Sequence, residues 1–156
     1  MSPQATLLLR YEHVVRLNDD SVPVPALSRV QVWNALAERA QSPGRYDDAI
    51  GACKTEQHAR GWRRRYDRLG TTIEDEARLK HDVSVTFITR APAEFRGSKL
   101  SITIDEPGVG TLFLRFSYEL RGTVPAPGER ECAALRIAYH HADLEFVRRL
   151  RLLTAS

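Results

Sequence analysis

The sequence predicts an α+β domain: a single antiparallel β-sheet of about 6–7 strands wrapped around a long C-terminal helix, with a short helix after strand 1. Two observations lead to this class. Apolar and polar residues alternate through most of residues 5–120, which is typical of strands with one face in water. After residue 129 the apolar residues recur at helical spacing instead. A length of 156 residues favours one domain, which we place at residues 1–156.

The N-terminal segment predicts a strand followed by a short helix. Residues from Ala5 to Leu17 alternate in the manner of a strand. One face of that strand carries apolar and aromatic residues and a histidine, which are Leu7, Leu9, Tyr11, His13 and Val15. Turn residues fill positions 18–25, and Ser28 then predicts the N-cap of a helix that runs to about Ala40. Ser42-Pro43-Gly44 predicts the end of this helix.

Residues 53–120 predict the rest of the sheet as consecutive strands joined by short turns. The residues expected on its inner face are Trp62, Arg64, Tyr66, Val83, Val85, Phe87, Leu100, Ile102, Ile104, Leu112, Leu114, Phe116, Tyr118 and Leu120. We expect a hairpin between residues 62 and 79 that turns at Gly70-Thr71. The strands therefore form a meander with one dry face and one wet face.

Residues Glu129–Leu153 predict the long helix. Its inward stripe is expected to consist of Leu135, Tyr139, Ala142, Phe146, Leu150 and Leu153. A helix of this span is about 37 Å long and can cross the whole sheet. One helix cannot fill all the space over a broad, twisted sheet. We therefore expect a cavity between the two, and apolar cavities of this kind are the usual sites for small ligands.

Four segments carry a resemblance to a known family. They are YEHVVRLND at Tyr11–Asp19, VPALSRVQVWNAL at Val24–Leu36, FLRFSYEL at Phe113–Leu120 and AYHHADLEFVRRLR at Ala138–Arg151. The chain resembles the AtaL-like family, which takes its name from a protein of the acetylaranotin biosynthesis cluster, within the START-like (SRPBCC) superfamily. This resemblance implies a helix-grip fold that holds a hydrophobic ligand between sheet and helix. It implies no catalytic residue and no cofactor.

The inner-face residues that we expect to contact a ligand form the predicted contact set. It comprises Tyr11, His13, Arg64, Tyr66, Asp75, Phe87, Phe116, Tyr118 and Tyr139. The aromatic members supply apolar walls, and the tyrosine hydroxyls supply polar groups. Ordinary core packing is the alternative for most of them. His13 can act as a general base near neutral pH, although a hydrogen-bonded structural histidine is favoured.

Arg64 is the charged residue on the expected inner face. A turn at Gly70-Thr71 places Tyr66 opposite Asp75 and Trp62 opposite Leu79. Arg64 then lies diagonal to Asp75, within reach of an ion pair that orients a carboxylate or carbonyl of a ligand. The favoured alternative is an Arg64 near the sheet edge that extends into water, because a one-residue slip of register reverses its face.

Other polar residues are expected outside the site. His140 and His141 are adjacent on a helix and cannot chelate one metal ion as an i, i+4 pair does. Asp143 and Glu145 are expected to pair with Arg148 and Arg149 on the helix surface. The two cysteines, Cys53 and Cys132, are expected to be small buried residues without a disulfide or a zinc site.

The expected function is the binding or carriage of a small hydrophobic or aromatic molecule. A pocket enzyme of the cyclase type is the first alternative, with His13 or the Arg64–Asp75 pair as its proton-transfer groups. Single-stranded nucleic acid is a weaker alternative: Arg60–Arg68 holds five arginines, but strand alternation divides them between two faces. A net charge of +3 does not decide among these.

The sequence also limits the setting of the protein. No apolar run approaches the roughly 18 residues that a membrane span needs. We see no signal-peptide pattern before Arg10 and expect a cytoplasmic protein. No P-loop, G-x-G-x-x-G, G-x-S-x-G or H-E-x-x-H motif is present. An exposed edge strand would allow a homodimer.

Overall fold

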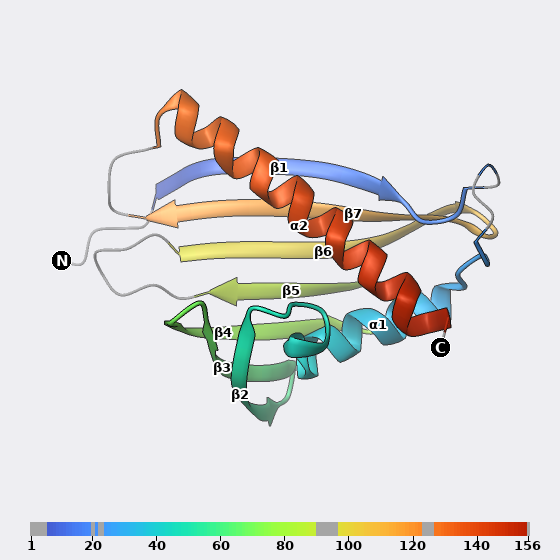
Figure 1. The fold of residues 1–156 in the computed structure, drawn as a ribbon, viewed down its shortest axis with the longest axis horizontal. Coiled ribbons are helices and arrows are strands. Elements are labelled where there is room, and N and C mark those ends of the chain that lie inside the picture. Colours follow the sequence, from blue (N-terminus) through green and yellow to red (C-terminus); the bar gives the residue numbers. More distant parts are fainter. Residues whose placement is uncertain (1–5, 20, 22–23, 90–96, 123–126, 156) are drawn as a thin grey trace.

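The structure is a computed structural model that describes residues 6–19, 21, 24–89, 97–122 and 127–155. Over these residues, seven strands form one antiparallel sheet in the order β1-β7-β6-β5-β4-β3-β2. Figure 1 shows a long C-terminal helix crossing one face of that sheet diagonally, with a shorter helix beside its last turns. The predicted α+β class is confirmed. Ala5, the expected first strand residue, lies outside the described residues.

The elements follow the expected order along the chain. The strands are β1 (Thr6–Arg16), β2 (Ile50–His58), β3 (Gly61–Arg68), β4 (Thr71–Lys80), β5 (Ser84–Thr89), β6 (Gly97–Gly108) and β7 (Thr111–Gly122). The helices are α1 (Arg29–Gln41), the 3-10 turn η1 (Pro43–Arg45) and α2 (Glu129–Ala155). β1 pairs with β7, so the segment containing α1 and η1 carries the chain from one edge of the sheet to the other. Neither α1 nor α2 is long and apolar enough to cross a membrane.

Ser28 begins α1 as expected. Its hydroxyl accepts a hydrogen bond from the Gln31 amide, and the Gln31 side chain accepts one from the Ser28 amide. This reciprocal pair satisfies two amides that the first turn leaves without helical partners. α1 buries one face against the sheet, through Val32, Trp33, Ala35, Leu36 and Ala40. The helix predicted to run from Ser28 to about Ala40 is confirmed.

The hairpin of β3 and β4 corrects the predicted register. Arg68 pairs with Thr71, so the turn consists of Leu69 and Gly70, whose φ angles are 50° and 81°. Two-residue turns with positive φ match the twist of the strands they join, which favours this turn over one centred on Gly70-Thr71. The expected pairs of Tyr66 with Asp75 and of Trp62 with Leu79 are therefore wrong. Arg64 itself lies opposite Asp75, because the error of two positions preserves the face of every residue.

Two smaller differences come from local geometry. A register shift between Leu7 and Leu9 turns Leu7 away from the inner face of the sheet. Leu7 is therefore 37% exposed. Arg65 lies opposite Glu74, 3.6 Å from it on the outer face, whereas a turn at Gly70-Thr71 would place Arg65 opposite Glu76.

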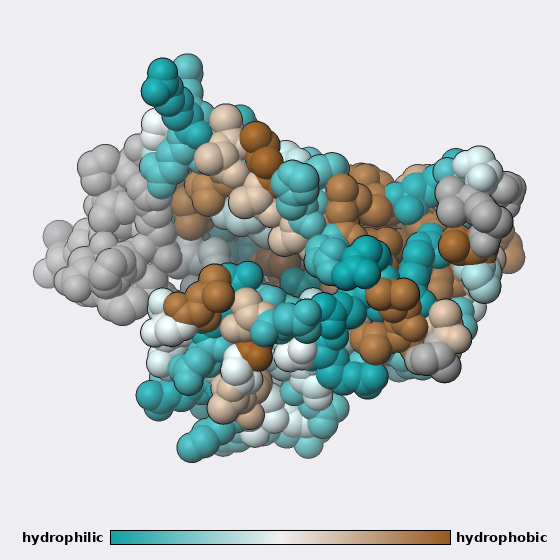
Figure 2. All heavy atoms as spheres, viewed as in Figure 1, coloured by the Kyte–Doolittle hydropathy of each residue, from teal (hydrophilic) through white to brown (hydrophobic). Residues whose placement is uncertain are grey.

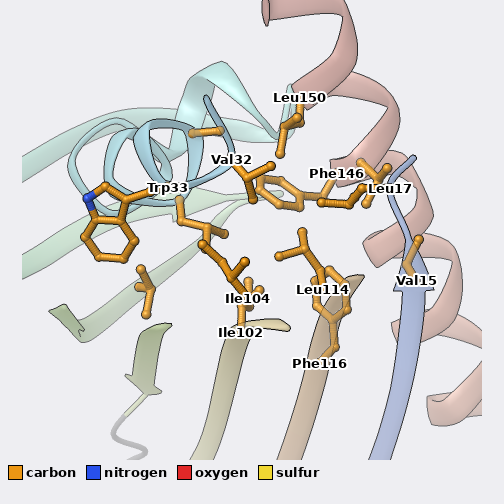
Figure 3. Close-up of a cluster of buried hydrophobic side chains, with 14 of the residues drawn as sticks. Val15, Leu17, Val32, Trp33, Ile102, Ile104, Leu114, Phe116, Phe146 and Leu150 are labelled. Atoms are coloured by element: carbon orange, nitrogen blue, oxygen red, sulfur yellow. The ribbon is translucent and has the colours of Figure 1, made fainter. Parts of the chain in front are cut away.

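The packed core occupies only part of the space beneath α2. Figure 3 shows it between α1, the C-terminal half of α2 and the inner face of the sheet. Its labelled members are Val15, Leu17, Val32, Trp33, Ile102, Ile104, Leu114, Phe116, Phe146 and Leu150. The buried residues of α2 lie between positions 143 and 150. The N-terminal half of α2 therefore covers the sheet without filling the space below it to the same degree.

Candidate functional site

A cavity of about 690 Å³ lies next to this core, between the middle of α2, strands β3–β7 and the segment that joins α1 to β2. Figure 2 shows the surface hollowed between α2 and that segment. Its apolar and aromatic wall includes Phe87, Leu100, Tyr118, Tyr139 and Phe146. Its charged wall includes Arg39, Arg64 and Asp75. A cavity beneath the C-terminal helix is therefore present where the sequence predicts one.

Arg64 and Asp75 form a bidentate ion pair in this wall. Arg64 Nε donates to Asp75 Oδ1 at 2.7 Å, and Arg64 Nη2 donates to Asp75 Oδ2 at 2.6 Å. Only 6% of Arg64 and 8% of Asp75 are exposed. The alternative of an Arg64 that extends into water is therefore wrong. Facing positions on β3 and β4 bring the two side chains together, and Tyr66 donates a further hydrogen bond to Asp75 Oδ2 at 3.2 Å.

Arg64 also holds the end of α1. Its Nη1 atom donates to the carbonyl oxygens of Arg39 at 3.0 Å and of Ala40 at 3.3 Å. The last carbonyls of a helix have no partners within it, and a cation there also interacts favourably with the helix dipole. Arg64 therefore donates hydrogen bonds both to the terminal carbonyl oxygens of α1 and to the carboxylate of Asp75.

Arg39 is a charged residue of the cavity wall that the sequence analysis missed, as are Asp47 and Asp48. Its guanidinium carbon lies 4.5 Å from the ring centre of Phe146 and 5.2 Å from that of Phe87. Its Nη1 atom is buried and has no hydrogen-bond partner among the described residues. Burial lowers the pKa of Arg39, but an arginine remains charged at neutral pH. Arg39 follows Val32 by seven positions, and this place on the inner stripe of α1 is the sequence signal for it.

A second polar cluster links α2 to β1 and β7. The Tyr118 hydroxyl donates to Asp143 Oδ1 at 2.5 Å, and His13 Nε2 shares a hydrogen bond of 2.6 Å with Asp143 Oδ2. Asp143 is 1% exposed, so its expected place on the helix surface is wrong. The reason is helical spacing: Asp143 follows Tyr139 by four positions and precedes Phe146 by three, which places it on the inward stripe. On the helix surface, Glu145 pairs with Arg148, and Arg149 pairs with Asp48 at 2.8 Å.

Burial sets the protonation of these groups. It raises the pKa of the Asp143 carboxyl, despite the hydrogen bonds from its neighbours, because the charged form loses water. Burial, followed by the negative charge of Asp143, raises the pKa of Tyr118. Burial and the negative charge of Asp75 raise the pKa of Tyr66 to about 12. Both tyrosine hydroxyls are therefore protonated donors at neutral pH.

Six members of the predicted contact set line the cavity, and three do not. Arg64, Tyr66, Asp75, Phe87, Tyr118 and Tyr139 belong to its wall. Phe116 is fully buried in the packed core, where its ring meets Phe146 edge-on. His13 contacts Asp143 instead, and Tyr11 stacks beside His13. The stacked rings of Tyr118 and Tyr139, 4.0 Å apart, form the cavity wall on that side.

The remaining candidates lie outside the cavity. His140 and His141 are exposed, as expected. Cys53 and Cys132 are free but half-buried, so the expectation of full burial is wrong. Arg63 and Arg65 face outward while Arg64 faces inward, which confirms that the arginines of Arg60–Arg68 are divided between two faces. Among the described residues, no group of three or more histidine, cysteine and acidic side chains is arranged to hold a metal ion.

Comparison with protein families relates the chain to one family over most of its length. Residues 11–156 match the family described as AtaL, acetylaranotin biosynthesis cluster protein L. The chain belongs to the AtaL family. No curated protein matches this AtaL-family chain by sequence.

Solved structures show the fold of this AtaL-family chain to be that of the START-like proteins. A START superfamily protein from Mycobacterium smegmatis has a TM-score of 0.66 and 13% identity, over 92% of this chain and 98% of that one. Norcoclaurine synthase from Thalictrum flavum has a TM-score of 0.66 and 8% identity, over 97% and 96%. The di-domain ARO/CYC protein StfQ of the steffimycin biosynthetic pathway has a TM-score of 0.69 and 12% identity, over 94% of this chain and 50% of that one.

Proposed function

We propose that this AtaL-family chain, as one domain over residues 1–156, binds or carries a small hydrophobic or aromatic molecule in the cavity beneath α2. The observation that carries the proposal is a cavity of about 690 Å³ walled by aromatic side chains, with a few buried polar groups at one end. Pockets for small molecules have volumes of about 300–1,000 Å³ and combine apolar walls with a few polar groups that orient the ligand.

The position of the cavity supports the proposal. Phe87 and Leu100 come from the sheet and Tyr139 and Phe146 come from the helix, so a ligand would lie between the two layers. Aromatic rings prefer stacked or edge-on contacts with other rings, which suits an aromatic ligand. Another protein of this fold, norcoclaurine synthase, has been solved in complex with dopamine and hydroxybenzaldehyde, which are both small aromatic molecules.

A pocket enzyme is the second candidate, and one observation favours it. The Tyr118 hydroxyl lies in the cavity wall and is connected through Asp143 to His13. A chain of hydrogen bonds from a cavity to an imidazole can move a proton to or from a bound molecule. Neighbours of this fold include an ARO/CYC protein and a synthase. Turnover of a bound molecule that persists in His13→Ala would exclude His13 from this role.

Native mass spectrometry of protein purified from cells tests the binding proposal most directly, because a retained molecule is detected by its mass. Uptake of the neutral aromatic dye N-phenyl-1-naphthylamine, followed by fluorescence, provides an independent measurement. We expect saturable dye binding to the wild-type protein. The proposal is overturned if no molecule co-purifies and the dye does not bind.

A matched pair of variants places the bound dye in the cavity. Both Ala142 and Ala138, one turn apart on α2, are exposed, but Ala142 lines the cavity and Ala138 does not. Ala142→Trp places a bulky side chain at the exposed edge of the cavity and should weaken dye binding about tenfold or more, since that side chain obstructs the ligand. Ala138→Trp should bind the dye as the wild type does. Equal binding by both variants would place the dye elsewhere.

The cytoplasmic location and the homodimer expected from the sequence stay predictions.

A further inference from the structure

We propose that the ligand of this cavity is an organic anion: an apolar or aromatic molecule with a carboxylate or another acidic oxygen group, which Arg39 selects. This inference rests on the proposed binding function and names the chemical class of its ligand. It follows from the charged groups of the cavity wall, one of which lacks an acceptor among the described residues.

The cations in the cavity wall differ in their partners. Arg64 pairs with Asp75 at 2.6 Å, Arg68 with Asp47 at 2.8 Å and Arg149 with Asp48 at 2.8 Å. Each of these charges is balanced by a carboxylate of the same chain. In the described part of the chain, Arg39 takes part in none of the ion pairs, and its buried Nη1 has no acceptor. Glu145, the remaining acid of the wall, pairs with Arg148, and the Asp143 carboxylate acts on Arg39 only at longer range. Arg39 is therefore the cation of the wall without an ion-pair partner among the described residues.

A buried polar group without a partner is unfavourable, and a buried charge is more so. Arg39 is half-buried, and its Nη1 atom is held without a partner by its surroundings. Phe146 and Phe87 attract its charge through their ring faces but offer no lone pair to its N–H groups. Arg64 fixes the backbone from which Arg39 extends, by donating to the Arg39 carbonyl oxygen at 3.0 Å. The guanidinium is thus positioned with hydrogen-bonding capacity left unused.

The chemistry of a guanidinium indicates what would use that capacity. Its planar set of N–H donors matches the two oxygens of a carboxylate or the oxygens of a similar acidic group. The aromatic side chains next to Arg39 require that such a group be attached to an apolar or aromatic body. An inorganic anion would leave the apolar wall unoccupied, and a neutral aromatic molecule would leave Arg39 unpaired.

Two dyes with the same aromatic framework separate these possibilities. 1-Anilinonaphthalene-8-sulfonate carries a sulfonate, and N-phenyl-1-naphthylamine is its neutral counterpart. Charge-assisted hydrogen bonds to the half-buried guanidinium of Arg39 should favour the sulfonate dye by about tenfold to a hundredfold in the wild-type protein. Dissociation constants from fluorescence titration, with competition between the two dyes to show a shared site, measure this preference.

Three substitutions assign the preference to Arg39. Arg39→Met keeps an apolar side chain at this position and should remove most of the preference, so that the dissociation constants of the two dyes approach each other. Arg39→Lys retains the charge and should retain part of the preference. Arg63→Met removes the same charge from the exposed outer face of β3 and should change neither affinity. Far-ultraviolet circular dichroism confirms that each variant is folded.

The outcomes distinguish failure of this inference from failure of the proposed function. Binding of neither dye, together with no co-purifying molecule, overturns the proposed function itself. Equal affinity of the wild-type protein for the two dyes overturns the inference and leaves the cavity as a site for neutral molecules. An equal loss of both dyes in Arg39→Met, with no recovery in Arg39→Lys, also overturns it, because Arg39 would then act only through packing.

Discussion

Two buried aspartates, Asp75 on β4 and Asp143 on α2, occupy similar surroundings with different partners. Each is almost fully buried, and each accepts a hydrogen bond from a tyrosine of the cavity wall. The second partner of Asp75 is Arg64, whereas that of Asp143 is His13. An arginine keeps its charge at every accessible pH, whereas an imidazole can either donate or accept the proton of its hydrogen bond. Asp75 is therefore suited to fixing the structure, and Asp143 to holding a proton that can move.

The largest expected effect on stability comes from removing Arg64, the permanently charged partner of Asp75. Arg64→Met leaves the Asp75 carboxylate buried without its cation and also removes the hydrogen bonds to the end of α1. We expect the free energy of unfolding, measured with urea, to fall by about 3–5 kcal/mol. The double variant Arg64→Met/Asp75→Leu should lose less than the single variant, because it removes the unpaired charge. A double variant less stable than the single one would contradict this interpretation of Asp75.

Removing the hydroxyl groups of Tyr118 and Tyr66 should have smaller effects on stability and compares the two aspartates directly. Tyr118→Phe removes a hydrogen bond of 2.5 Å from a carboxylate that has one other partner, and should cost about 1.5–3 kcal/mol of stability. Tyr66→Phe removes a longer bond of 3.2 Å from Asp75, which keeps both bonds to Arg64, and should cost about 0.5–1 kcal/mol. Urea unfolding of the two variants under the same conditions tests this order. Equal losses would mean that Asp75 and Asp143 depend on their tyrosines alike.

The smallest expected effect is a dependence of stability on pH. Asp143 faces His13 on β1, Tyr118 on β7 and the more distant Arg39 on α1, and its folded-state pKa is raised above the ordinary 3.8. The folded protein therefore binds the proton of Asp143 more tightly than the unfolded chain does. This contribution to stability is present below pH 3.8 and is lost as the pH rises through the folded-state pKa.

Asp143→Asn supplies the control for this dependence, because the amide resembles the protonated acid and does not titrate. The difference in unfolding free energy, wild type minus variant, should fall as the pH increases above 3.8. A difference that instead grows with pH would show that Asp143 is stabilised as a carboxylate beside a protonated His13.

The sequence pattern was sufficient to predict the sheet and to place one of these aspartates, Asp75, on its inner face. Strand alternation placed Arg64 and Asp75 on the inner face, and that conclusion tolerated a register error of two residues because the side-chain period is two. The same alternation could not separate Phe116 from Phe87, since both face inward. Whether an inward ring meets packed side chains or a cavity depends on the helix residue above it, which is the bulky Phe146 over Phe116.

Arg39 and Asp143 show where sequence reasoning failed. Charged residues on helices usually face water, and that expectation outweighed their positions on the inner stripes of α1 and α2. Arg39 continues the spacing of Val32 and Leu36, and Asp143 lies between Tyr139 and Phe146 in the same way. A charged side chain at a stripe position is therefore a useful signal, because its burial needs a partner or a ligand.

The link that Arg64 makes between α1 and the β3–β4 hairpin has a consequence for ligand entry. Its guanidinium is bonded to Asp75 and to the carbonyl oxygens of Arg39 and Ala40. The last turn of α1 cannot separate from the hairpin without breaking these bonds together, so the two segments open as one cooperative unit. The charged end of the cavity is thus preorganised before a ligand arrives. A ligand then orders little of the protein when it binds, and little conformational entropy is lost.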